Sequence, residues 1–175
     1  TNYNQSQYVK ALEYYLKAQP IAEKYNDRKL MPQVYNNMAN IYKDLDNYSR
    51  SYPYRLMALK IYREDNYKYG IAALLSNTGY DLMNMVDTSL QRIGYTHKQR
   101  VDTVLVYFRR ALVLFDELGM PYGTASVLGN MGLLYNNLDR YDSALIYQQK
   151  SYNYFKQLDA KLDMAGCLGD MSLIY

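Results

Sequence analysis

The sequence predicts an all-α fold in which antiparallel helix pairs repeat along the chain. Three observations support this prediction. A short segment recurs with a period of 40 residues, apolar residues within each copy fall at helical spacing, and clusters of Asn and Asp separate the helical stretches. The chain has 175 residues, enough for a short array of such pairs.

The recurring segment contains a small residue and usually ends in an aromatic one. Its copies occupy positions 38–42, 78–82, 131–135 and 171–175, so successive shifts are 40, 53 and 40 residues. The spacing of Tyr14, Tyr54, Tyr107 and Tyr147 is the same. The middle interval exceeds the period by 13 residues, which predicts an insertion near residues 83–100.

Each copy carries one apolar face of a helix. Val34, Met38, Ile41 and Leu45 fall at i, i+4, i+7 and i+11, as expected for a helix with one buried side. The same reasoning predicts eight helices, at about 5–25, 30–44, 49–64, 68–85, 97–118, 122–137, 141–157 and 161–175. The methionines Met38, Met131 and Met171 fall on this face and are predicted to be core residues.

The four prolines test these boundaries. Pro32 and Pro121 come at helix starts, where a missing N–H costs little. Pro20 should kink or end the first helix. Pro53 suggests either a kink or a late helix start with Ser51 as the N-cap.

Composition excludes several classes of function. The net charge of +3 is too small to indicate nucleic-acid binding, and the single cysteine, Cys167, excludes an internal disulfide or a Cys-based zinc cluster. The apolar runs are far shorter than the roughly 20 residues of a membrane span. We therefore expect that this region contacts neither nucleic acid nor membrane. Cys167 is predicted to be a packed small apolar residue.

The repeat resembles the tetratricopeptide repeat (TPR) family in its longer-period variety of about 40 residues. The residues that carry the resemblance are small or aromatic: Ala39, Gly79, Gly132 and Ser172; Tyr42, Tyr135 and Tyr175; Tyr8, Tyr48 and Tyr141; Ala11 and Ala144; Ala18, Ala58 and Ala111. The resemblance implies a right-handed superhelix of antiparallel helix pairs with a concave groove. It covers one domain, 1–175, with units at 29–68, 69–121 and 122–161 between partial units 1–28 and 162–175. We interpret the chain as a piece of a longer protein.

The sequence departs from the family pattern at three places. Leu82 stands where Tyr is expected, and Arg55 and Gln148 stand where Tyr15 and Phe108 supply an aromatic ring. We expect the neighbouring tyrosines, Tyr54 and Tyr147, to take over that packing.

The resemblance implies that the first helix of each pair lines the groove. The expected lining is Gln33, Asn36, Asn37, Asn40 and Lys43; Ala73, Ser76, Asn77, Tyr80 and Asn84; and Ser126, Asn130, Leu133 and Asn137. Within this set, Asn36, Asn37, Asn40, Lys43, Asn77, Tyr80, Asn84, Asn130 and Asn137 are the predicted peptide-binding residues. Because Lys43 is the single cation among them, a clamp for a C-terminal carboxylate is not expected.

Equivalent positions of the first helices form a ladder of Asn37, Asn77, Asn130 and Asp170. An amide offers both a donor and an acceptor, so the ladder could hold the backbone of an extended peptide. The alternative is that these side chains hydrogen-bond between helices inside the array. The sequence leaves both open.

The insertion is locally basic, with Arg92, His97, Lys98 and Arg100 against Asp87. Thr96 and Gln99 have the spacing of a capping box at the start of the next helix. The insertion is either an accessory binding edge or a solvated loop, and the second is favoured because loops tolerate added length. His97 is predicted to be a surface residue.

Catalytic signatures are missing from the sequence, which shows no phosphate loop, nucleophile elbow or metal-spaced cluster. We therefore expect no enzyme activity, no cofactor and no metal. The predicted function is a protein- or peptide-binding scaffold. The alternative is a sensory or assembly segment of a bacterial signalling regulator, cytoplasmic or extracytoplasmic, whose histidine kinase or DNA-binding output lies elsewhere. Self-association is a third hypothesis.

Overall fold

The computed structural model describes residues 2–174, and side chains for residues 7–174. The described part of the chain folds into nine helices without a strand. These are α1 (Asn2–Lys24), α2 (Leu30–Asp44), α3 (Tyr48–Glu64), α4 (Lys68–Asn84), α5 (Asp87–Arg92), α6 (His97–Glu117), α7 (Pro121–Asn136), α8 (Tyr141–Gln157) and α9 (Lys161–Ser172).

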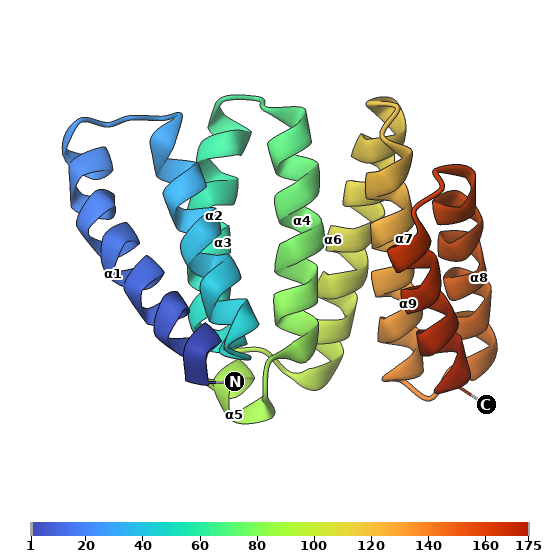
Figure 1. Cartoon of the computed structure of the whole chain (residues 1–175). Helices are drawn as coiled ribbons and strands as arrows, with labels where there is room; N and C mark the ends of the chain where they lie inside the picture. The colour runs from blue at the N-terminus through green and yellow to red at the C-terminus, as the bar shows by residue number, and fades with distance from the viewer. Residues whose placement is uncertain (1, 175) are drawn as a thin grey trace.

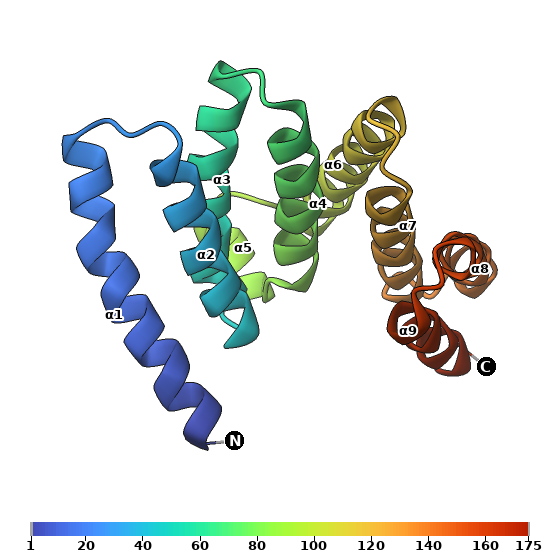
Figure 2. The same ribbon diagram turned by 45° about the horizontal axis from the view of Figure 1, so that its top comes forward.

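The helices form two layers that run along the array (Figure 1). The first helices of the units, α2, α4, α7 and α9, make one layer, and the second helices, α1, α3, α6 and α8, make the other. Figure 2 shows the layer of first helices bending so that its middle lies deeper than its ends. Most consecutive helices pack on each other, α4 packs on α6 across the insertion, and α4 also packs on α7. The fold is therefore an all-α solenoid, as predicted.

Helix boundaries agree with the predicted ones to within a few residues, except in the insertion. The insertion, predicted to be a loop, contains the additional helix α5. The capping box is confirmed, because the Thr96 hydroxyl accepts from the Gln99 N–H at 3.2 Å and the Gln99 side chain accepts from the Thr96 N–H at 2.9 Å.

At Pro20 and Pro53 the structure excludes one of the two predicted alternatives, a helix end at Pro20 and a late helix start at Pro53. Helix α1 does not end at Pro20, and α3 begins at Tyr48 with Asn47, not Ser51, as its N-cap. Pro20 and Pro53 lie on exposed faces. Water can therefore satisfy the carbonyl that each proline leaves without a partner. Ser51 is instead buried inside α3.

The repeat extends to the backbone of the turns. In the turn that follows each second helix, one residue adopts a positive φ of between 47° and 63°. These residues are Asn26, Asn66, Gly119 and Asp159. These four positions share the spacing of the repeat. Asn, Asp and Gly are the residues that tolerate this conformation, so each copy of the repeat carries a residue suited to the turn between units.

The small residues of the repeat let the two layers approach closely. A Cβ atom on Gly79 would lie 2.6 Å from the ring of Phe108, and one on Gly132 would lie 2.8 Å from the Gln148 side chain. Tyr54 stacks on Tyr42 with centroids 5.7 Å apart and Tyr147 stacks on Tyr135 at 5.2 Å, whereas Gln148 itself faces Gly132 in the place that Phe108 has against Gly79.

The methionines of the apolar face have different outcomes. Met38 and Met131 are buried, as predicted, but Met171 is only partly buried. The reason is that α8 covers one side of α9, whereas no second helix covers its other side in the described part of the chain. A repeat position is buried only when the neighbouring helix is present.

Salt bridges between consecutive units repeat as well. Arg28 pairs with Glu64 at 2.9 Å and Asp65 at 2.7 Å, and Lys68, the equivalent of Arg28 one unit later, pairs with Glu117 at 2.9 Å. All five side chains are well exposed, so each pair contributes about 0–1 kcal/mol.

Candidate functional site

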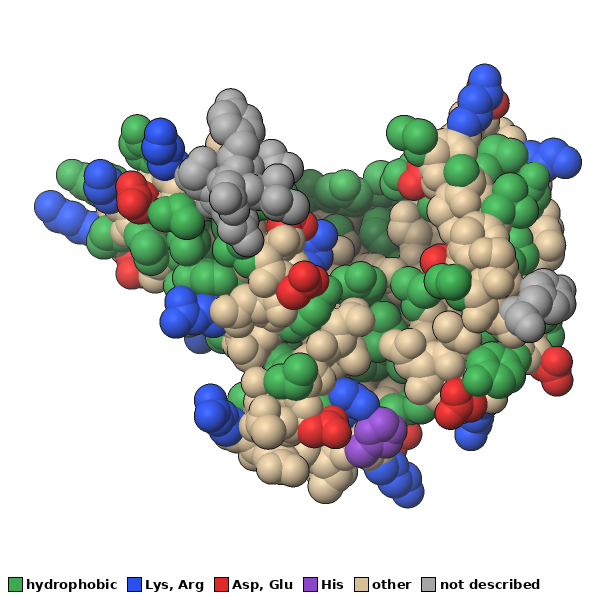
Figure 3. All heavy atoms as spheres, turned by 60° about the horizontal axis from the view of Figure 1, so that its bottom comes forward, with side chains coloured by type: hydrophobic (Ala, Val, Ile, Leu, Met, Phe, Trp, Pro, Cys, Tyr) green, Lys and Arg blue, Asp and Glu red, His purple; other side chains and the backbone are tan. Residues whose placement is uncertain are grey.

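The side of the array formed by the first helices is hollowed. Figure 3 shows the hollow between the two ends of the chain, with hydrophobic and uncharged polar side chains on most of its wall and few charged ones. Helices α2, α4 and α7 carry the predicted groove residues. We call this surface the concave face.

The predicted binding residues keep a partly exposed position on these helices. Gln33 and Asn137 are exposed and Ser76 is buried; the remaining predicted lining residues are half-buried. Asn36, Asn37, Asn40 and Lys43 come from α2, Asn77, Tyr80 and Asn84 from α4, and Asn130 and Asn137 from α7 or its C-cap. The face therefore presents amides from three consecutive units to one hollow.

Two members of the Asn/Asp ladder bond within the array, and the other two are available for peptide binding. Asn130 donates to the Ser76 hydroxyl on α4 at 3.3 Å, and Asp170 accepts from Gln148 on α8 at 2.9 Å. These two members bond between helices of the array. For Asn37 and Asn77, no side-chain hydrogen bond is found within the described residues, and both amides are partly exposed. The peptide-binding hypothesis therefore rests on the first two units.

A buried polar cluster lies beneath the concave face, and the sequence analysis missed it. Arg55 on α3 donates from Nε to Asp81 on α4 at 3.1 Å and from Nη1 to Asn36 on α2 at 2.5 Å. The Ser51 hydroxyl lies between Asp81 Oδ2 and the Ala39 carbonyl oxygen. Asp81 Oδ1 is buried without a hydrogen-bond partner among the described residues.

Both charges of this cluster are costly to bury. Loss of solvation raises the pKa of Asp81 and is opposed by the charge of Arg55 and the bond from Ser51. Loss of solvation likewise lowers the pKa of Arg55, opposed by Asp81. The pair joins three helices of two units and fixes Asn36, a predicted binding residue, through its side-chain oxygen. Asn36 is left with its NH₂ group to offer a ligand.

At the equivalent junction near the C-terminal end, a neutral side chain, Gln148, takes the place of Arg55. Gln148 on α8 donates to the Gly129 carbonyl on α7 at 3.3 Å and to Asp170 on α9 at 2.9 Å. The signal that could have located both clusters is the departure at Arg55 and Gln148, where a polar residue replaces an aromatic core residue. We interpreted it only as a packing substitution.

The remaining chemistry of the concave face is neutral. The Lys43 ammonium pairs with Asp44 at 2.7 Å, and Asn84 donates to the Tyr80 carbonyl at 2.8 Å. Tyr48 and Tyr80 form an edge-on aromatic pair with centroids 6.2 Å apart. Such a surface can hydrogen-bond and pack against a ligand without selecting it by charge.

The insertion is more than a solvated loop. Met85 and Leu90 are buried, and Arg100 on α6 donates to the Met85 carbonyl at 3.2 Å and lies 3.6 Å from Asp87. Arg100 thus holds the insertion in place. His97, as predicted, is exposed, as are Arg92 and Lys98.

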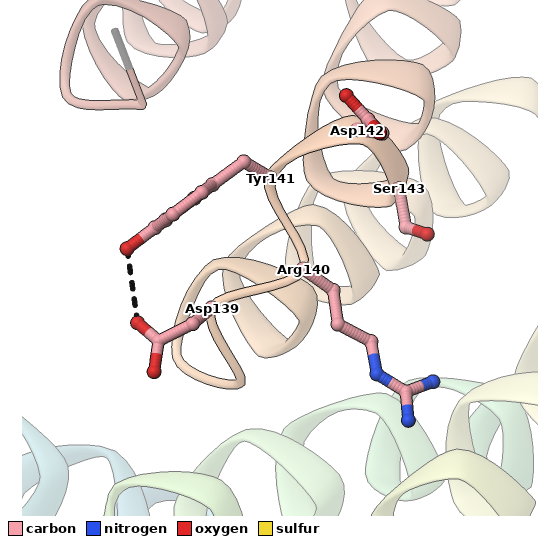
Figure 4. Close-up of a pocket in the computed structure, with 5 residues that line it drawn as sticks. All are labelled: Asp139, Arg140, Tyr141, Asp142 and Ser143. Carbon is pink, nitrogen blue, oxygen red and sulfur yellow. Dashed lines mark hydrogen bonds between the residues drawn. The ribbon is translucent and has the colours of Figure 1, made fainter.

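A separate depression at the α7–α8 turn is lined by five consecutive residues, Asp139 to Ser143 (Figure 4). The Tyr141 hydroxyl donates to Asp139 at 3.0 Å, while the Arg140 side chain points to the other side of the turn. Tyr48 donates to Asp46 in the equivalent turn at 3.2 Å. The contact is a repeated turn feature, and these side chains do not converge on a ligand.

Two further observations concern metal and membrane binding. No group of three or more His, Cys, Asp or Glu side chains within the described residues is arranged to hold a metal ion. No described helix is long and apolar enough to cross a membrane. Cys167 is buried, as predicted, with its Sγ 3.4 Å from the Ser151 hydroxyl, and burial raises the pKa of its thiol.

Similarity to known proteins is seen in the fold. No family model matches the chain, and a search of curated proteins finds no relative. The structure of BtubC (BKLC) from P. vanneervenii is similar with a TM-score of 0.74 and 19% sequence identity, covering 98% of this chain and 66% of BtubC. The chain is similar to slightly less than two thirds of that protein. This similarity supports a helical repeat fold.

A second solved structure is more distant. It is a signal transduction ATPase with numerous domains (STAND) that has a tetratricopeptide repeat sensor, from Pyrococcus horikoshii. The match covers 99% of this chain and 31% of the chain of that protein, with 16% sequence identity and a TM-score of 0.41. This similarity is too low to support an argument about this chain.

Proposed function

We propose that this chain is a non-catalytic scaffold of the tetratricopeptide repeat family whose concave face binds an extended segment of a partner protein. The single observation that carries the proposal is the set of partly exposed amides on α2 and α4, which face one uncharged hollow. An extended peptide has an unpaired N–H and C=O at nearly every residue, and side-chain amides can bond both.

The buried cluster supports this proposal because it orders part of the surface. Arg55 holds Asn36 from below, so this amide is positioned before a ligand arrives. A surface that is already ordered loses less conformational entropy on binding. The near-neutral lining also implies that the partner segment is recognised through its backbone and apolar side chains.

The proposal is tested with the triple variant Asn37→Ala, Asn40→Ala, Asn77→Ala. Wild-type and variant chains of equal helicity are coupled to resin and exposed to native cell extract, and each captured partner is then measured as a purified protein. We expect the triple variant to weaken that interaction at least about tenfold, since each lost hydrogen bond costs about 0.5–1.5 kcal/mol.

A matched control carries Gln149→Ala and Asn153→Ala. These two exposed residues of α8 bond to each other at 3.1 Å on the opposite layer. The control should bind like wild type. Equal binding by wild type and by the triple variant would show that the concave amides do not hold the partner.

A second candidate function, assembly, is favoured by one observation on α9. Leu168 is 52% exposed, whereas the equivalent Leu75 and Leu128 in other units are 0% and 7% exposed. In those units a second helix of the same unit covers the position. A sensory or assembly segment of a signalling regulator would use such a face to join another helix. In that case molecular mass should rise with concentration, and Leu168→Ser should abolish the rise.

A further inference from the structure

The insertion and helix α3 build a second surface, away from the concave amides. An apolar pocket of about 370 Å³ lies between them. Its walls include Tyr52, Pro53 and Leu56 from α3, and Met85, Ile93 and Tyr95 from the insertion and its flanks. This volume is near the lower end of the range for ligand pockets, about 300–1,000 Å³.

The pocket has an apolar rim that the array itself does not use. Leu56 is 36% exposed and Ile93 is 45% exposed, whereas Tyr52 and Met85 behind them are buried. Packing of the insertion therefore stops short of closing the pocket. Apolar side chains gathered around a concave site, with polar residues outside, are typical of interaction surfaces.

A second hollow of about 420 Å³ adjoins the first across Pro53. Ser49 and Pro53 contribute to both hollows, and the second also contains Tyr42, Tyr54 and Met57. Arg50 closes one side of it, with its guanidinium 5.8 Å from the centre of the Tyr42 ring. The first hollow is largely apolar, and the second also includes Gln19 and Arg50 beside its aromatic and Met side chains. The two hollows on either side of Pro53 suit a ligand with two apolar side chains.

Exposed Lys and Arg side chains outnumber carboxylates around this pair of hollows, although Glu23 on α1 accepts from Gln19 in the wall of the second hollow. The exposed residues of α3 include Arg50, Lys60 and Arg63, and α3 has no carboxylate before Glu64 at its end. Exposed Arg92 adjoins Ile93, whereas the carboxylate of the insertion, Asp87, lies beside Arg100. Figure 3 looks toward this end of the molecule, where both blue Lys and Arg and red Asp and Glu side chains lie around the purple histidine.

We propose that the two hollows and their basic rim form a docking site for an acidic peptide segment with two apolar anchor residues. We call it the α3–insertion surface. The anchors fill the hollows on either side of Pro53, and the acidic residues between and beside them meet Arg50 and Arg92. Hollows fit projecting side chains better than they fit a flat lipid surface, which favours a peptide over a membrane. The proposal does not depend on the function of the concave face.

The test uses a fluorescein-labelled probe peptide, Glu-Glu-Leu-Glu-Glu-Leu-Glu-Glu, and fluorescence anisotropy at low and physiological salt. Two matched probes replace Glu by Lys or Leu by Ser. The acidic Leu probe should bind most tightly, and its affinity should fall with salt. Ile93→Ser and Arg92→Glu should each weaken it about tenfold, because one buried anchor or one charge pair is lost.

The control variant is Ile146→Ser, which replaces a comparably exposed apolar residue of α8. It should bind the probe like wild type, and all variants should have equal helicity. The Asn37→Ala, Asn40→Ala, Asn77→Ala variant should also keep probe binding. This arrangement separates a failure of the α3–insertion surface from a failure of the concave face.

Several results would overturn the proposal. These are equal binding of the Lys and Glu probes, unchanged affinity in Ile93→Ser, or loss of probe binding in the concave-face variant. Binding to phosphatidylserine vesicles that requires Ile93, without binding of the peptide, would assign the surface to a membrane. A concentration-dependent mass that Ile93→Ser abolishes would assign it to a second copy of the chain.

Discussion

Equivalent positions of the four second helices carry Tyr15, Arg55, Phe108 and Gln148. The same site in the array is thus aromatic in two units and polar in two. Its partner position is apolar in Ile41 and Leu134 but acidic in Asp81. Arg55 and Asp81 changed together from the apolar pattern, and each is buried because the other is present. The net contribution of such a buried charge pair to the free energy of unfolding is small, because burying both charges is costly. Removing one partner is strongly destabilising, because the other charge then stays buried without a partner.

The first prediction concerns this pair. Asp81→Leu should lower the free energy of unfolding by about 3–5 kcal/mol, because it leaves the Arg55 guanidinium buried without a counter-charge. The double variant Arg55→Met, Asp81→Leu should recover most of the loss, since it restores an apolar contact of the kind found at other junctions. Urea unfolding followed by circular dichroism measures both. A double variant as unstable as Asp81→Leu would mean that the cluster stabilises the array by itself.

At the scale of the helix, the same contact between the two layers recurs in different units with different side chains. A small residue of the first helix faces a large residue of the second helix, as Gly79 faces Phe108 and Gly132 faces Gln148. This contact determines how closely the two layers approach. The same glycines weaken the helix they belong to, because glycine lacks intrinsic helix propensity. Packing therefore outweighs propensity at these positions.

Two glycine variants separate these effects. Gly79→Ala should lower the free energy of unfolding by about 1–3 kcal/mol, because its Cβ would meet the Phe108 ring at 2.6 Å. Gly166→Ala on α9, where no atom lies within 4 Å of the new Cβ, should raise it by about 0.5–1 kcal/mol. Chemical unfolding of the two variants checks both signs. A stabilising Gly79→Ala would contradict the close contact.

For the molecule as a whole, stability follows from neighbour contacts. Most helices pack on helices before and after them in the chain, whereas α1 packs on α2 and α9 packs on α8. The exposed apolar residues of the end helices, such as Leu16, Ile21 and Leu162, reflect this one-sided packing. In an array of this kind each unit is stabilised by its neighbours, so opening begins where a neighbour is missing.

Amide hydrogen exchange tests this distribution of stability. We expect the fastest exchange in α1 and α9 and the slowest in α4 and α6. These two helices pack on each other, α4 also packs on α3 and α7, and α6 also packs on α7. Mass spectrometry of proteolytic fragments resolves the helices. Uniform exchange across all of them would instead indicate all-or-none opening of the array.

The sequence by itself determined the repeat, the type of fold and most helix boundaries. These features depend on local spacing: apolar residues at helical intervals, turn residues that tolerate positive φ, and the capping box at Thr96. The sequence did not decide between a kink and a helix end or late start at Pro20 and Pro53, because that choice depends on exposure, which local spacing does not reveal.

Only the tertiary structure decided which polar residues meet across units. Arg55 and Asp81 are 26 positions apart and come together because α3 and α4 pack side by side. The same packing brings the insertion back onto α3 and gives that helix a pocket that its own repeat lacks. It also leaves Met171 half-exposed, although the repeat marks it as core. Long-range contacts of this kind depend on which helices are neighbours in space, and a periodic pattern does not contain that information.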